Sequence, residues 1–137
     1  MSYYMTKTVS VPFEKALERT IAGLKAEGFG VVSEVDVSGI LKKKLDVPFR
    51  KYRILGACNP GLAHRALQAE NKIGVMLPCN LVVQETDGGA TEVSTIDPAE
   101  SMQAVGNPGL ADLAGTVRAA LRRVLDGIES RGGAAAD

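Results

Sequence analysis

The chain has no tryptophan, one histidine and two cysteines, and these scarcities exclude several classes of protein. Two cysteines are too few for the disulfide framework of a small secreted protein, so we expect a cytoplasmic, reducing location. The N-terminal residues lack the charged and apolar blocks of a signal peptide. No apolar run approaches the roughly 18 residues that a membrane span requires, so we expect no membrane partner.

Net charge is also absent, because 16 basic residues balance 16 acidic ones. Zero net charge with 45% hydrophobic residues excludes a disordered chain and argues against nucleic-acid binding through a whole-surface field. Aromatic residues make up 4% of the chain and offer few stacking platforms, so we expect no nucleic acid as a partner. A chain of 137 residues suits one domain. We expect it to span residues 1–129, with a flexible tail over residues 130–137.

Hydrophobic spacing predicts the elements of the first half of the chain. A period of two predicts a strand over residues 3–11. Apolar spacings of three and four from Phe13 to Leu24 predict a helix, with Pro12 at its first position and Gly28 at its end. A strand over residues 29–35 follows, then a short helix capped by Asp36, then a strand over residues 51–57.

The second half of the chain is predicted in the same way. Extended runs over residues 73–77 and 81–86 are separated by Pro78, which indicates a bulge or an edge position. The Asp87-Gly88-Gly89 sequence predicts a hairpin turn to a strand over residues 91–96. A long helix over residues 108–128 carries a regular apolar stripe that is typical of core, and part of this stripe is a candidate subunit contact.

Three helix starts use the same pair of residues, a capping side chain followed by proline. These pairs are Asn59-Pro60, Asp97-Pro98 and Asn107-Pro108. The asparagine or aspartate can accept a hydrogen bond from the first helical turn, and proline loses nothing at the first helical position.

The order of the elements predicts an α+β fold with a β-α-β-β-β-β-α core and short inserted helices. A largely antiparallel sheet with helices packed on one face satisfies this order. The late hairpin and the absence of a glycine-rich phosphate loop argue against a parallel Rossmann sheet.

The two cysteines flank the predicted helix that begins at Asn59-Pro60. Cys58 directly precedes the capping residue, where the helix dipole favours a thiolate. If the strands on either side of this helix are antiparallel, Cys58 and Cys79 share one end of the sheet. If the connection is a parallel crossover, they lie at opposite ends, and the sequence leaves both arrangements open.

The single histidine, His64, lies in the second turn of the same helix, flanking the stripe formed by Leu62 and Ala66. Cys58, His64 and Cys79 have the ligand chemistry for zinc, copper or haem iron. The simpler interpretation is two small buried cysteines and a surface histidine, because the sequence has no closely spaced cysteine pair and no identifiable fourth ligand.

Residues 42–53 form a basic stretch with six cations and Asp46 as the sole acid. Such a stretch is a candidate site for a phosphate or carboxylate. The simpler interpretation is a cluster of lysines at a helix end on a solvated face.

Several motifs together resemble the domain of unknown function 302 family. They are the run from Gly28 to Asp36, the run from Tyr52 to Pro60, Leu62-Ala63-His64, Leu77-Pro78-Cys79-Asn80, Ile96-Asp97-Pro98 and the long final helix. The resemblance implies a compact α+β domain with a curved, largely antiparallel sheet, commonly a homodimer, and it favours the arrangement in which both cysteines share a sheet end. It implies no established reaction. The residues that match the family's polar and sulfur-bearing pattern are Arg53, Cys58, Asn59, Pro60, His64, Pro78, Cys79 and Asn80.

Three functional hypotheses follow. The first is a homodimeric binding module for a small or anionic ligand, a metal or a haem, with candidate ligand-binding residues Arg53, Cys58, Asn59, His64, Cys79 and Asn80 and candidate metal ligands Cys58, His64 and Cys79. The second is a self-association or partner-binding domain without a catalytic site. The third is a thiol-based redox protein in which Cys58 attacks and Cys79 resolves.

Overall fold

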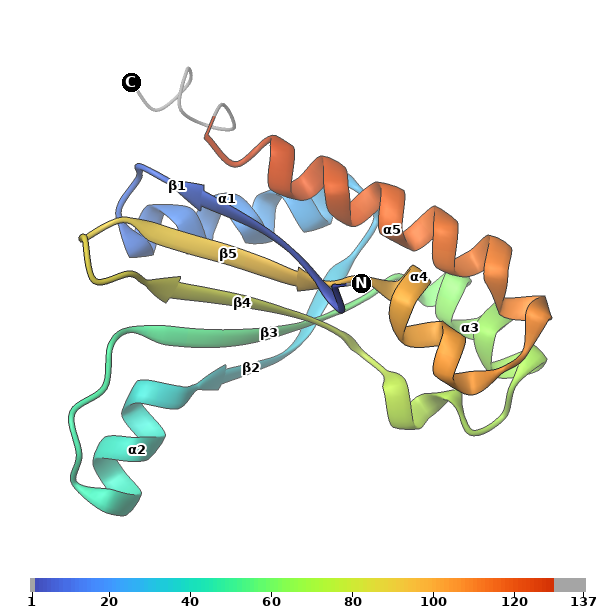
Figure 1. Ribbon diagram of the computed structural model, residues 1–137, viewed down its shortest axis with the longest axis horizontal. Coiled ribbons are helices and arrows are strands. Elements are labelled where there is room, and N and C mark those ends of the chain that lie inside the picture. The colour runs from blue at the N-terminus through green and yellow to red at the C-terminus, as the bar shows by residue number, and fades with distance from the viewer. Residues whose placement is uncertain (1, 130–137) are drawn as a thin grey trace.

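The computed structural model describes residues 2–129, and its centre is an open five-stranded antiparallel sheet of order β1-β5-β4-β3-β2 (Figure 1). The strands are β1 (Tyr4–Val9), β2 (Gly30–Asp36), β3 (Tyr52–Cys58), β4 (Cys79–Glu85) and β5 (Thr91–Ile96). The α-helices are α1 (Phe13–Ala26), α2 (Val37–Leu45), α3 (Pro60–Ala69), α4 (Pro98–Ser101) and α5 (Ala111–Asp126). Three 3₁₀ turns join them: η1 (Ile73–Met76), η2 (Met102–Val105) and η3 (Pro108–Leu110). The predicted α+β class is confirmed.

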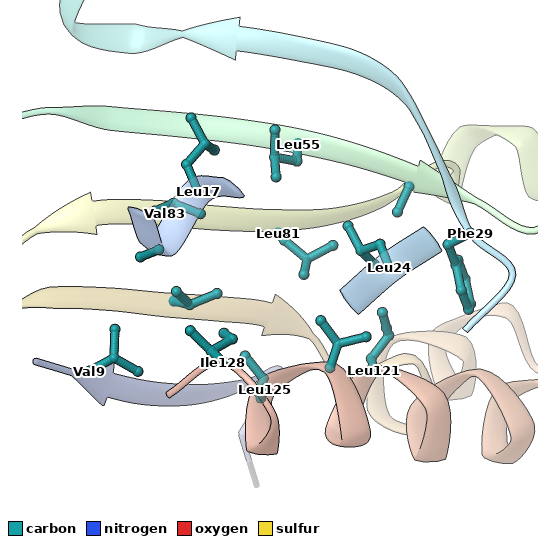
Figure 2. Packing of buried hydrophobic residues seen from close by; sticks show 14 of the residues in the cluster. Val9, Leu17, Leu24, Phe29, Leu55, Leu81, Val83, Leu121, Leu125 and Ile128 are labelled. Atoms are coloured by element: carbon teal, nitrogen blue, oxygen red, sulfur yellow. The ribbon is translucent and has the colours of Figure 1, made fainter. Parts of the chain in front are cut away.

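Helices α1 and α5 cover one face of the sheet, and the main hydrophobic core lies between these layers (Figure 2). Alternate residues of the strands point into this core, as the period of two predicts. Leu24 of α1, Leu121 of α5 and Ile128, just beyond the end of α5, are fully buried. The apolar stripe of the final helix therefore forms core along its C-terminal half.

Most of the residues predicted to begin or end helices do so in the structure. Gly28 adopts φ +85°, a left-handed conformation that glycine reaches without steric cost, and it ends α1 where expected. The side chains of Asn59, Asp97 and Asn107 accept hydrogen bonds from Leu62 N, Ala99 N and Gly109 N, respectively. Asn107 caps the 3₁₀ turn η3, so the helix predicted over residues 108–128 begins at Ala111 instead, without a side-chain cap, and ends at Asp126. Pro12 differs from its expected place, since it is the residue before α1 and Phe13 is the first helical residue.

The strand predicted over residues 73–77 is wrong, because this segment forms the 3₁₀ turn η1. Its apolar residues do not alternate in burial: Ile73 is buried, whereas Val75 is 87% exposed. Ile73 packs with Leu110 and Leu113 in a second hydrophobic cluster outside the sheet. Tertiary contacts with that cluster therefore override the apparent strand pattern.

Pro78 lies neither in a bulge nor on an edge strand. It directly precedes β4, which is an interior strand between β3 and β5, so no ladder position requires its missing N–H. The irregularity in the sheet lies instead in β2, between Val31 and Ser33.

Helix α2 projects from the far end of β2 and β3, at the lower left of Figure 1, and none of its residues is buried. Asp36 caps it as predicted, by accepting a hydrogen bond from Gly39 N at 3.1 Å. Within residues 2–129, no helix has the length and apolar character needed to cross a membrane. The tail predicted over residues 130–137 lies outside the described residues.

Candidate functional site

The antiparallel β3–β4 pair brings the two cysteines to the same end of the sheet. Ala57 pairs with Cys79 across this ladder, and Cys58 is the last residue of β3. Of the two topologies that the sequence leaves open, the antiparallel one is therefore observed. The polypeptide between the cysteines leaves the sheet as α3 and η1 and returns at Pro78.

A pocket of about 260 Å³ lies where these strand ends meet the second hydrophobic cluster. Cys58 and Cys79 line it from the sheet. The opposing walls come from α3, η1, α4, η2 and the N-terminal half of α5, and their lining side chains include Leu62, Ala66, Met102, Leu113 and Val117. None of its described lining residues is charged. The pocket is therefore an apolar site with two thiols and the Asn59 amide as its polar groups.

The close approach of Gly56 and Pro78 shapes the sheet end beside Cys79. A Cβ on Gly56 would lie 2.6 Å from Pro78 Cγ and would also overlap the Ser33 hydroxyl. Real Cβ atoms do not tolerate such contacts, so only glycine allows β3 to pass this close to Pro78. The proline ring is thereby held at the entry to β4, immediately before Cys79.

The thiol of Cys79 is strongly biased toward its protonated form. Burial raises the pKa of Cys79 from 9.0 to about 11, and the nearby Cys58 contributes to the same shift. Cys79 is therefore a neutral thiol near pH 7 and a poor attacking group. It resembles a small apolar wall of the pocket more than a reactive centre.

His64 is exposed and does not line the pocket. Leu62 and Ala66 turn one side of α3 toward the pocket. His64 follows Leu62 by two residues, about 200° around the helix, and so points away. Among the described residues, no group of three or more His, Cys, Asp or Glu side chains lies close enough to hold a metal ion. The structure therefore does not bring Cys58, His64 and Cys79 together as a metal centre.

Two further candidate residues also lie outside the pocket. Arg53 makes ion pairs with Glu34 and Asp36 on β2, toward the α2 end of the sheet. The pKa of Asp36 is lowered, chiefly by the hydrogen bond from Gly39 N and also by Ser38 and Arg53. Asn80 is exposed and lines a separate hollow of about 450 Å³ on the sheet face that α1 and α5 leave open. Cys58, Asn59 and Cys79 are thus the candidates that converge.

The basic stretch does not gather its side chains around one anion site. Lys42 pairs with Asp46 at 2.7 Å, Lys51 pairs with Glu14 at 3.6 Å, and Arg50 donates to Gln84 at 2.8 Å. These partners come from different elements and spread the cations apart.

The far wall of the pocket was missed from the sequence. Leu110, Leu113 and Val117 belong to the apolar stripe of the last helix, which is typical of core. The length of that stripe could have indicated this wall, because a helix longer than the strands that it covers must extend past the sheet. Its N-terminal half therefore extends beyond the sheet and lines a pocket with α3 and η1.

Comparisons with known proteins agree with this architecture. A family model described as domain of unknown function DUF302 matches residues 5–128. A crystal structure of an uncharacterized conserved DUF302 protein from Bacillus stearothermophilus has 31% sequence identity and a TM-score of 0.86. The similarity covers 92% of this chain and 98% of that one. A search among curated proteins gives no match.

Proposed function

Because the chain belongs to the DUF302 family, whose description names no activity, we propose from the pocket itself that the protein binds a small, uncharged, apolar ligand beside Cys58 and Cys79. The single observation that carries this proposal is the apolar pocket at the end of β3 and β4. Largely apolar pockets with a few polar groups are the usual form of small-molecule sites.

The size and chemistry of the pocket define the ligand class. An engineered apolar cavity of roughly 150 Å³ accommodates benzene, so a pocket of about 260 Å³ suits a somewhat larger molecule. A charged ligand would be desolvated without a charged partner among the described lining residues, which is costly. Asn59 and the two thiols can orient a neutral ligand that has one or two polar atoms.

A neutral fluorescent probe, N-phenyl-1-naphthylamine, tests this proposal. We expect its fluorescence to rise on binding and the melting temperature to rise with probe concentration, because the ligand stabilises the folded state that binds it. Ala66→Phe fills the pocket from α3 and should weaken binding at least about tenfold. Leu67→Phe adds a ring to the next, exposed position of the same helix and is the matched control. Absence of probe binding to the wild type, or equal binding by both variants, contradicts the proposal.

Homodimer formation is the second part of the proposal and follows from the family resemblance. The strand β2 supports it, because within residues 2–129 this seven-residue edge strand pairs with β3 alone, and almost all of its residues are exposed. Exposed edge strands offer unpaired backbone groups to another chain. Light scattering coupled to gel filtration measures the mass directly, and a monomer mass at every accessible concentration contradicts this part.

The metal, haem and thiol-redox alternatives have less support. His64 lies outside the pocket, so two cysteines without the imidazole are left to hold a metal. The raised pKa of Cys79 also opposes a role as a readily ionised thiol. The apolar-ligand proposal requires neither a metal centre nor a thiolate.

A further inference from the structure

Residues 42–51 form an ordered protrusion in which every residue is exposed. This segment, termed here the α2 tip, comprises the last turn of α2 and the loop that leads to β3. In Figure 1 the end of α2 is the lowest part of the molecule, and the loop rises from there back to β3. The α2 tip does not contribute to the pocket or to the hydrophobic clusters.

Local interactions rather than core packing maintain this shape. Asp36 caps the start of α2, and Gly39 leaves space for it, since a Cβ there would lie 2.6 Å from the Asp36 carboxylate. Asp46 adopts the left-handed conformation at φ 54° and donates its N–H to Lys42 O, which ends the helix. The guanidinium of Arg50 stacks on the Phe49 ring at 4.4 Å. The segment is thus held in place while Leu45, Val47 and Phe49 stay partly exposed.

Three large apolar side chains lie in one five-residue stretch of the α2 tip, residues 45–49. Leu45 is 66% exposed, Val47 is 40% exposed and Phe49 is 41% exposed. Single exposed apolar residues are common on protein surfaces, but a local cluster on a protrusion indicates an interaction surface.

The charge around this apolar cluster is strongly positive. The α2 tip contains five cations, namely Lys42, Lys43, Lys44, Arg50 and Lys51, against Asp46 alone. Arg50 and Lys51 bind Gln84 of β4 and Glu14 of α1, so the three lysines carry the charge at the end of α2. Asp46 pairs with Lys42, and among the described residues no ion pair is observed for Lys43 or Lys44. Exposed apolar side chains that follow exposed lysines in one short segment are complementary to a surface that is anionic outside and apolar beneath.

We propose that the α2 tip is a peripheral docking surface for an anionic lipid bilayer. Leu45, Val47 and Phe49 insert at the level of the headgroups, while the lysines extend their charged ends to lipid phosphates. A second copy of the chain does not fit this surface, because a symmetric contact would oppose the same lysines. A nucleic acid would pair with the lysines but would leave Leu45 and Val47 without a partner. This proposal departs from the expectation of no membrane partner, which rested on the lack of a spanning segment, because peripheral contact needs none.

Co-sedimentation of the full chain with lipid vesicles tests this proposal. We expect binding to vesicles that contain phosphatidylglycerol, little binding to pure phosphatidylcholine vesicles, and release by added salt. Replacing both Lys43→Gln and Lys44→Gln should lower the partition coefficient about thirty-fold, since each lysine near an anionic surface contributes roughly fivefold. Replacing both Leu45→Ser and Val47→Ser should lower it at least about tenfold.

Matched substitutions outside the α2 tip are the controls. Lys25→Gln with Lys72→Gln removes two exposed cations from other elements, and Val75→Ser removes another highly exposed apolar side chain. These variants should bind as the wild type does, and unchanged melting curves should accompany all four. The proposal is overturned if anionic vesicles fail to sediment the wild type, or if the controls weaken binding as much as the tip variants. It is also overturned if the protein binds double-stranded DNA more tightly than vesicles and the Leu45 and Val47 changes leave vesicle binding unaltered.

Discussion

The guanidinium of Arg19, in the middle of α1, donates to the carbonyl oxygen of Ile128 at 3.3 Å, just beyond the end of α5. The same Nη1 group also donates to Glu129 O at 3.1 Å. Arg19 is 6% exposed, and its Nε has no hydrogen-bond partner within residues 2–129. A buried arginine therefore joins α1 to the segment that follows α5 by donating to two of its backbone carbonyls.

Replacing Arg19 with methionine should destabilise the fold. Arg19→Met retains the apolar stem but leaves the carbonyls of residues 128 and 129 without this donor, so we expect a loss of about 1–3 kcal/mol in the free energy of unfolding. Urea titration followed by circular dichroism measures it. Arg122→Met is the control, since Arg122 makes an exposed ion pair with Asp126 whose loss should cost at most about 0.5 kcal/mol. Equal midpoints for Arg19→Met and the wild type would show that this link contributes nothing.

Replacing Gly56 with alanine should damage both stability and the pocket. The new methyl group would overlap Pro78 Cγ and the Ser33 hydroxyl, so β3 and the entry to β4 must separate. We expect a loss of about 1–3 kcal/mol and weaker binding of the naphthylamine probe. Gly30→Ala is the control, because nothing lies within 4 Å of a Cβ at that position. A fully stable Gly56→Ala protein with unchanged probe binding would refute the close-packing explanation.

The raised pKa of Cys79 predicts its reactivity with iodoacetamide. Alkylation requires the thiolate, so the rate at Cys79 should keep rising well above pH 9 and level off near pH 11. Mass spectrometry of peptides from samples modified at each pH gives the rate at this position. A plateau near the unperturbed pKa of 9.0 would contradict a buried neutral thiol.

The same shift predicts how Cys79 affects stability at high pH. The pKa of Cys79 is higher in the folded state than in the unfolded state. The contribution of its neutral thiol to the stability of the fold is therefore fully present below about pH 9 and is lost as pH rises toward 11. The wild type should therefore lose more stability over this range than a Cys79→Ala variant. Comparing the two proteins cancels the titration of lysines and tyrosines that they share. Parallel stability curves would contradict the shift.

Breaking the pair between Asp97 and Arg118 should separate the end of β5 from α5. Arg118 Nε lies 3.1 Å and 3.0 Å from the two carboxylate oxygens of Asp97, and the same carboxylate accepts from Ala99 N. Asp97→Ala should cost about 1–3 kcal/mol, since it removes a helix cap and a charged hydrogen bond together. A double-mutant cycle with Arg118→Ala separates these two contributions, and a coupling energy near zero would show that the ion pair adds nothing.

The candidate site could be predicted only in part, because some of its residues are marked by local sequence signals and others reach the pocket only through tertiary packing. Cys58 and Asn59 were identified from a local signal, the end of a strand beside a helix cap. Val117 and Met102 could not be identified in this way, since an apolar residue that lines a pocket has the same sequence pattern as one in the core. His64 has ligand chemistry, but the rotation of α3 removes it from the pocket.

Local backbone chemistry in the sequence alone determined the sheet-and-helix order, the three capped helix starts and the turn at Gly28. These features depend on residues within a few positions of one another, so no distant contact is needed to specify them. Tertiary structure decided between the two β3–β4 arrangements that the residues themselves left open, and it alone decided the 3₁₀ turn at residues 73–76 and the partners of Arg53. Each of these depends on which surface a segment contacts after the chain has folded. Hydrophobic burial has no directional preference, so an apolar residue in the sequence does not specify which partner will bury it.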